Sequence, residues 1–141
     1  MSQSILKTKA VTPNSTIVAK EWVRNPEWVP MPSFTPGEQK YAMLYKVHDG
    51  PNPVGFRVTG AAYTVDWGDG SVPENVAVDT TASHDLSWAG CDPDTLTSDG
   101  YRQALIIVTP TSGGTFSGAY FWQYPHPAVP ANTISHSGML D

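Results

Sequence analysis

Apolar and polar residues alternate in short segments along most of the chain. Residues 41–47 place large apolar side chains at every second position from Tyr41 to Val47, which is the period of a half-buried strand. Residues 101–109 are apolar on both faces from Ala104 to Val108, as in a central strand. Strands are predicted at residues 41–47, 54–58, 60–66, 75–78, 84–88, 101–109 and 116–124. No window of about eleven residues keeps a helical period, so an all-β fold is predicted.

The best specified stretch is Tyr63-Thr64-Val65-Asp66-Trp67-Gly68-Asp69-Gly70-Ser71. Its first four residues alternate as those of a strand do. Gly68 and Gly70, with Asp69 between them, tolerate the positive φ angles of a tight turn. The stretch therefore predicts a strand that runs into a sharp acidic turn.

Residues 1–37 are predicted to form an extended arm, because their five prolines restrict φ and remove backbone donors. The arm carries more apolar side chains than a solvated linker does. These side chains either fold back on their own domain or dock on a neighbouring subunit. The residues assigned to docking are Trp22, Val23, Trp28, Val29 and Phe34, with the two tryptophans as anchors. Residues 38–125 are assigned to a sandwich domain, and 126–141 to a tail or the start of a further segment.

Composition argues against several partners. The 141 residues carry a net charge of -5, and the eight Lys and Arg residues are scattered, so the basic patch that nucleic-acid binding needs is missing. We expect no nucleic-acid partner. No apolar run reaches the length of about 18 residues that a membrane span needs, and the N-terminus has no signal-peptide core, so no membrane partner is expected. Cys91 is the single cysteine, which excludes an intrachain disulfide.

Asp66 and Asp69 are the residues to consider for a cation, because hard carboxylate oxygens suit Ca²⁺. Their spacing is not that of an EF-hand, and Ser71 and Glu74 are weak candidates for further ligands. We predict that each aspartate accepts hydrogen bonds from nearby turn amides. No metal and no cofactor is expected.

A non-enzymatic protein is predicted. The histidines lie too far apart in sequence for two of them to share a metal by a short motif. A nucleophile at Ser87 or Cys91 beside His84 has no identifiable base to orient the imidazole. The glycine-rich residues 111–115 lack the lysine of a phosphate-binding loop.

Aromatic residues alternate in the last predicted strand, at Tyr120, Trp122 and Tyr124. Aromatic planes of this kind can stack on sugar rings. Aromatic residues in sheets are more often part of the core, so these three side chains are predicted to be buried in the core. Carbohydrate binding is kept as an alternative.

Three landmarks resemble, in order, those of the polycystic-kidney-disease (PKD) repeat. They are Val65-Asp66-Trp67-Gly68-Asp69-Gly70-Ser71, then His84, then Gly100-Tyr101 before Leu105-Ile106-Ile107-Val108. Leu86 stands where the family has its first tyrosine, Gly100-Tyr101 lacks the residue that the family has between the glycine and the tyrosine, and the span 87–99 is longer than usual. The resemblance implies an immunoglobulin-like antiparallel β-sandwich, in which Trp67 and His84 pack near the turn and the aspartates hold it.

A second resemblance covers most of the chain. It is similar to the N-terminal region of tailed-bacteriophage structural proteins, particularly tail-fibre or baseplate-associated chains. The similarity rests on Arg24-Asn25-Pro26-Glu27-Trp28-Val29-Pro30-Met31-Pro32, Gly37-Glu38-Gln39-Lys40, Tyr63-Thr64-Val65-Asp66-Trp67-Gly68-Asp69-Gly70 and Gly100-Tyr101-Arg102-Gln103-Ala104. In such relatives the region often continues into a longer repetitive part, so the chain is expected to be a portion of something larger.

This second resemblance implies a virion component made in the host cytoplasm. Its expected partners are neighbouring copies in a homo-oligomer and tail or capsid subunits, reached through the N-terminal arm. Two alternatives remain open. One is an adhesive module that binds host-surface glycans, and the other is a capsid decoration protein.

Overall fold

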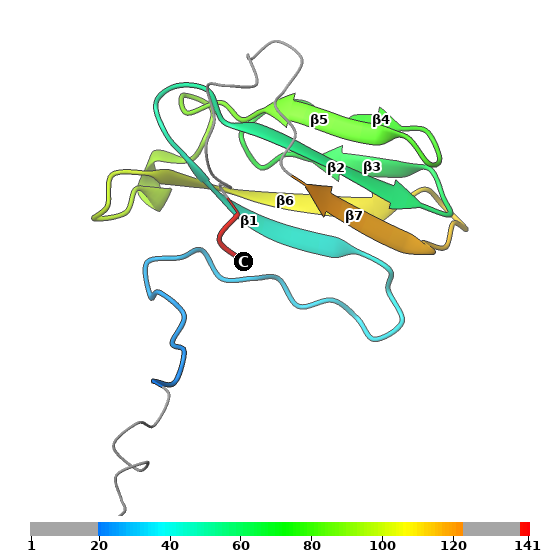
Figure 1. The fold of residues 1–141 in the computed structure, drawn as a ribbon, viewed down its shortest axis with the longest axis horizontal. Coiled ribbons are helices and arrows are strands. Elements are labelled where there is room, and N and C mark those ends of the chain that lie inside the picture. The colour runs from blue at the N-terminus through cyan, green and yellow to red at the C-terminus, as the bar shows by residue number, and fades with distance from the viewer. Residues whose placement is uncertain (1–19, 123–138) are drawn as a thin grey trace, which may run out of the picture.

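A computed structural model describes residues 20–122 and 139–141 (Figure 1). The described part contains strands, one short 3-10 helix and no α-helix. The elements are β1 (Tyr41–Val47), β2 (Pro53–Thr59), β3 (Tyr63–Asp66), β4 (Glu74–Val76), β5 (Thr81–Asp85), η2 (Pro93–Thr95), β6 (Arg102–Pro110) and β7 (Gly118–Trp122). The predicted all-β class is confirmed.

The strands form two antiparallel sheets, one with the order β1-β6-β3-β4 and one with the order β5-β2-β7. Inward-facing side chains from both sheets make one core. Phe56 from β2 lies at its centre, with its ring 5.7 Å from that of Trp67 and 6.3 Å from that of Tyr63. Burial of these aromatic side chains is a main source of stability for a domain of this size.

Most of the predicted strands are present, and β6 lies between β1 and β3, which confirms the predicted central strand. The prediction for residues 84–88 was wrong, because β5 ends at Asp85. After Asp85 the backbone N–H groups no longer pair with β2 as a strand. The N–H of Leu86 donates to the Asn52 carbonyl, and that of Ser87 donates to the Asp69 carboxylate.

The aromatic residues of β7 point the other way from the prediction. The register places Phe121 opposite Phe56, with the two rings 6.0 Å apart, so the inward face carries Phe121. Tyr120 is 50% exposed, so the prediction that it belongs to the core was wrong. Successive strand residues face opposite sides, and alternation alone did not reveal which side was buried. Tyr124 lies outside the described residues.

The described part of the predicted arm runs beside β1 without forming a strand (Figure 1). Of the tail assigned to 126–141, only the last three residues are described. They lie against β1 on the side away from β6, where Met139 forms an antiparallel bridge with Tyr45. The Leu140 N–H also donates to the Leu44 carbonyl over 2.7 Å. Segments from both ends of the chain therefore meet at β1.

The turn after β3 passes very close to β6. Gly68 has a φ of +70°, and a Cβ at this position would lie 2.3 Å from the carbonyl oxygen of Leu105. Only glycine fits such a contact, because real Cβ atoms do not approach backbone this closely. Gly100 has a similar φ of +88°, but a Cβ there would meet nothing within 4 Å.

These two glycines form a matched pair for a stability test. We expect Gly100→Ala to lower the free energy of unfolding by about 1–2 kcal/mol through backbone strain alone. Gly68→Ala adds steric overlap with β6, which contributes about 1–3 kcal/mol more. Urea denaturation of both variants measures the difference. Equal losses would contradict the close approach of the turn to β6.

Candidate functional site

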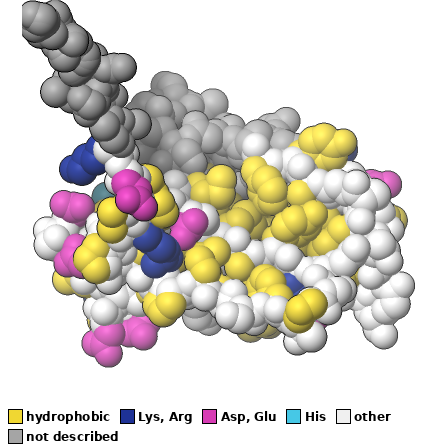
Figure 2. Space-filling model, turned by 90° about the horizontal axis from the view of Figure 1, so that it is seen from below, with side chains coloured by type: hydrophobic (Ala, Val, Ile, Leu, Met, Phe, Trp, Pro, Cys, Tyr) yellow, Lys and Arg dark blue, Asp and Glu magenta, His cyan; other side chains and the backbone are white. Residues whose placement is uncertain are grey.

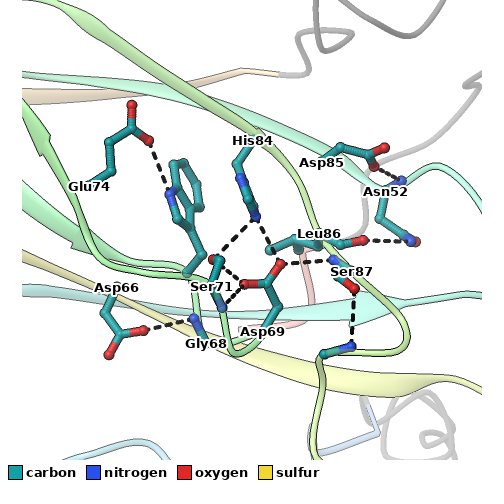
Figure 3. Close-up of polar contacts among 12 residues, drawn as sticks. Asn52, Asp66, Gly68, Asp69, Ser71, Glu74, His84, Asp85, Leu86 and Ser87 are labelled. Atoms are coloured by element: carbon teal, nitrogen blue, oxygen red, sulfur yellow. Dashed lines mark hydrogen bonds and ion pairs between the residues drawn. The ribbon is translucent and has the colours of Figure 1, made fainter.

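The acidic turn surrounds a buried carboxylate. Asp69 is 1% exposed, and both of its oxygens accept hydrogen bonds (Figure 3). Oδ1 accepts from the backbone N–H of Ser71 over 3.2 Å and from the hydroxyl of the same residue. Oδ2 accepts from the backbone N–H of Ser87 over 2.8 Å and lies 2.8 Å from Nε2 of His84. The carboxylate is thus fully paired.

Trp67 and His84 extend this cluster across the two sheets. The indole follows β3 and the imidazole comes from β5, and the rings stack at 4.8 Å with an interplanar angle of 19°. The indole Nε1 of Trp67 donates to Glu74 Oε1 over 3.2 Å. The turn, the end of β5 and the start of β4 are therefore joined around one buried tryptophan.

Two opposing effects act on the pKa of Asp69. Burial raises it, because a charge loses its hydration. The hydrogen bonds from Ser71, Ser87 and His84 favour the charged form and outweigh burial, so the pKa lies below its usual value of 3.8. Asp69 is therefore an ionised acceptor at neutral pH, and the proton between it and His84 lies on Nε2.

The arrangement does not suit a cation. The groups that face Asp69 are N–H and O–H donors, whereas a calcium site needs several oxygen ligands around the ion. Asp66 accepts from the Gly68 N–H over 3.0 Å and lies at the exposed side of the turn. Within residues 20–122 and 139–141, no three His, Cys, Asp or Glu side chains cluster as metal ligands.

The cluster also lacks the geometry of a catalytic triad. A triad uses one imidazole nitrogen for the carboxylate and the other for the nucleophile. Here Nε2 of His84 faces both Asp69 and the hydroxyl of Ser71, the latter at 3.5 Å. This nitrogen already directs its proton to the carboxylate, so it has no lone pair to accept one from the hydroxyl.

Cys91 is a poor nucleophile in this setting. Its side chain is buried, and this burial raises the thiol pKa to about 11, with the nearby Asp69 charge adding to the rise and Arg102 opposing it. The thiol stays protonated at neutral pH, whereas the thiolate is the reactive form.

The arm residues Trp28 and Val29 lie on their own domain. The indole Nε1 of Trp28 donates to the Tyr101 hydroxyl over 3.0 Å, and the backbone N–H of Val29 donates to Gln103 Oε1 over 2.7 Å. Nε2 of the same glutamine donates a hydrogen bond of 2.8 Å to the Glu27 carbonyl. Gln103 is buried, so residues 27–29 are fixed on the outer side of β6.

Trp22 and Val23, by contrast, are 69% and 77% exposed. Phe34 is half-buried, with the Lys40 ammonium 5.7 Å from its ring centroid. Figure 2 shows apolar side chains over the face seen from below, with charged ones gathered where the arm leaves the domain. The five arm residues predicted to bind thus divide into a fixed pair, an exposed pair and an intermediate phenylalanine.

The sequence prediction missed the pairing of Asp69 with His84, because the two residues lie fifteen positions apart, one in the turn after β3 and one in β5. Comparisons with protein-family models, curated proteins and solved structures found no match. No helix in the described part of the chain is long and apolar enough to cross a membrane. The evidence for function therefore comes from the chain's own residues.

Asp69→Asn tests the buried carboxylate. The variant keeps the side-chain volume but turns an amide NH₂ toward at least one donor, which leaves buried polar groups unpaired. We expect a loss of about 2–4 kcal/mol in the free energy of unfolding at neutral pH. Asp66→Asn is the control, because its carboxylate is exposed, and we expect a loss of about 1 kcal/mol or less. Urea denaturation checks both values.

The stability lost in Asp69→Asn should depend on pH. Because the folded-state pKa of Asp69 is lowered, its contribution to stability is present above the usual value of 3.8 and is lost as the pH falls through the folded-state pKa. The stability difference between wild type and Asp69→Asn should therefore shrink in acid. Denaturation curves at a series of pH values measure it, and a difference that stays constant would argue against an ionised Asp69.

Proposed function

We propose that this chain is a non-enzymatic structural protein of a tailed-bacteriophage particle, in a tail fibre or baseplate, and that it docks on neighbouring subunits through its N-terminal arm. The observation that carries the docking role is the exposure of Trp22 and Val23 immediately before a segment fixed to the domain. Membership of a virion is supported by the resemblance of residues 24–32, 37–40, 63–70 and 100–104.

Trp22 and Val23 have the properties of interface anchors. Large aromatic side chains held in a partner's pocket dominate the binding energy of typical interfaces. Residues 27–29 are held by hydrogen bonds before any partner arrives. Less conformational entropy is lost on docking when the neighbouring chain is already ordered. An exposed Trp-Val pair next to a fixed segment is thus suited to bind a neighbouring subunit.

The immunoglobulin-like type of the sandwich is part of this proposal. It is supported by the pairing of β2 with β5 and of β3 with β6, which are neighbours in the immunoglobulin fold. The outer strands differ from that fold. β1 pairs with β6 and β7 pairs with β2, whereas the immunoglobulin fold places its first strand beside the second and its last beside the sixth.

A carbohydrate-binding role is the second candidate, favoured by the 50% exposure of Tyr120 on β7. The Arg57 guanidinium lies 5.2 Å from the centroid of the Tyr120 ring. Aromatic rings beside a charged donor are suitable for contact with sugars. Reproducible binding on a glycan array that is lost in Tyr120→Ala would favour this candidate over docking.

Variants of the exposed pair test the docking role. We expect Trp22→Ala and Val23→Ser to leave the unfolding midpoint unchanged, because both side chains are exposed. Phage particles assembled with Trp22→Ala should retain about thirty-fold less of the chain, if the tryptophan contributes about 2 kcal/mol to docking. Quantitative immunoblotting of purified particles measures the retained chain.

Val72→Ser is the matched control, since Val72 is 85% exposed and belongs to the connection after β3. It should be retained like wild type. Point variants are cleaner here than removal of residues 1–37, which would also remove the bonds of Trp28 and Val29 to the domain. Retention of Trp22→Ala and Val23→Ser at the wild-type level would contradict docking through this pair.

A further inference from the structure

The side chain of Arg24 joins two segments that are far apart in the sequence. Its Nε donates to Asp141 Oδ2 over 2.7 Å. Its Nη1 and Nη2 donate to the carbonyl oxygens of Trp28 and Val29 over 3.1 Å and 2.6 Å. One guanidinium therefore links the arm to the C-terminal residues, and its planar shape fixes the three acceptors relative to one another.

Asp141 is itself held in place by the main chain of β1. The Leu44 N–H donates to the Asp141 carbonyl over 2.7 Å, and the Leu140 N–H donates to the Leu44 carbonyl over the same distance. The residues drawn in red in Figure 1 lie next to β1, on the side where the arm passes. Because Leu44 is fully buried, the carboxylate of Asp141 is presented from a fixed position.

Arg24 directly follows the exposed pair Trp22 and Val23. Residues 20–23 make no hydrogen bond to another described residue, so the point at which the arm becomes fixed is Arg24. The contacts of Arg24 are the first after the exposed pair that hold the arm to the domain. Among these contacts, Asp141 is the only one from outside the arm.

We infer that Arg24 and Asp141 are positioning residues, through which the C-terminal segment sets how Trp22 and Val23 are presented to a neighbouring subunit. The inference rests on the proposed docking function. Both side chains are about one-third exposed, so the ion pair contributes little to the stability of the domain. Its effect is to hold the arm before the partner binds, which lowers the entropy lost on docking.

Asp141→Ala removes the ion pair and leaves the main-chain bonds to β1 available. We expect amide hydrogen exchange at Val29 to become about two- to five-fold faster, as for the loss of a surface ion pair, while exchange in β6 stays unchanged. Retention in phage particles should fall by a similar factor. Asp141→Glu, which restores the charge, should behave like wild type in both measurements.

Asp49→Ala is the matched control, because Asp49 is an exposed carboxylate on the loop after β1. It changes the net charge equally, and it should alter neither exchange at Val29 nor retention. If Asp141→Ala is retained like wild type while Trp22→Ala is lost from particles, the positioning role is wrong and docking stands. If Trp22→Ala is itself retained normally, the docking function fails, and the positioning role falls with it.

Discussion

The buried carboxylate of Asp69 is the constraint on which the arrangement of the turn depends. A charge that is 1% exposed is tolerated only where hydrogen bonds replace its lost water. The donors come from its own turn, from β5 and from the loop after β5, at Ser71, His84 and Ser87. The turn, β5 and the loop after β5 must therefore lie together around Asp69. Trp67, in the same turn, is buried. The acidic turn thus has a structural explanation that requires no ligand.

The same constraint shows what could be predicted from the sequence. β1 and the central strand β6 follow from local alternation and apolar runs, which neighbouring residues alone determine. The end of β5 does not, because it depends on a bond from Ser87 to Asp69. The pairing of Asp69 with His84 was not predicted for the same reason, since a contact between a turn and a distant strand leaves no local pattern in the sequence. The inward face of β7 was misassigned because alternation defines two faces without saying which is buried.

The arm illustrates a different limit. Apolar side chains such as Trp22 and Trp28 look alike in a sequence, whether they pack on their own domain or on another protein. The structure separates them, because Trp28 donates to Tyr101 whereas Trp22 stays exposed. What distinguishes the two is the hydroxyl of Tyr101, just before β6, which accepts from the Trp28 indole. Tyr101 lies 73 positions from Trp28 in the sequence and is near it only in the folded chain.

Two parts of the chain thus have different roles. The buried acidic turn stabilises the sandwich, and we propose that the exposed end of the arm binds other subunits. The most direct test is a high-resolution reconstruction of the phage particle into which we propose that this chain assembles. The account predicts that residues 20–23 are buried against a neighbouring subunit, while Asp69 keeps its bonds to Ser71, His84 and Ser87. A reconstruction in which the arm is free and neighbours contact the chain elsewhere would contradict it.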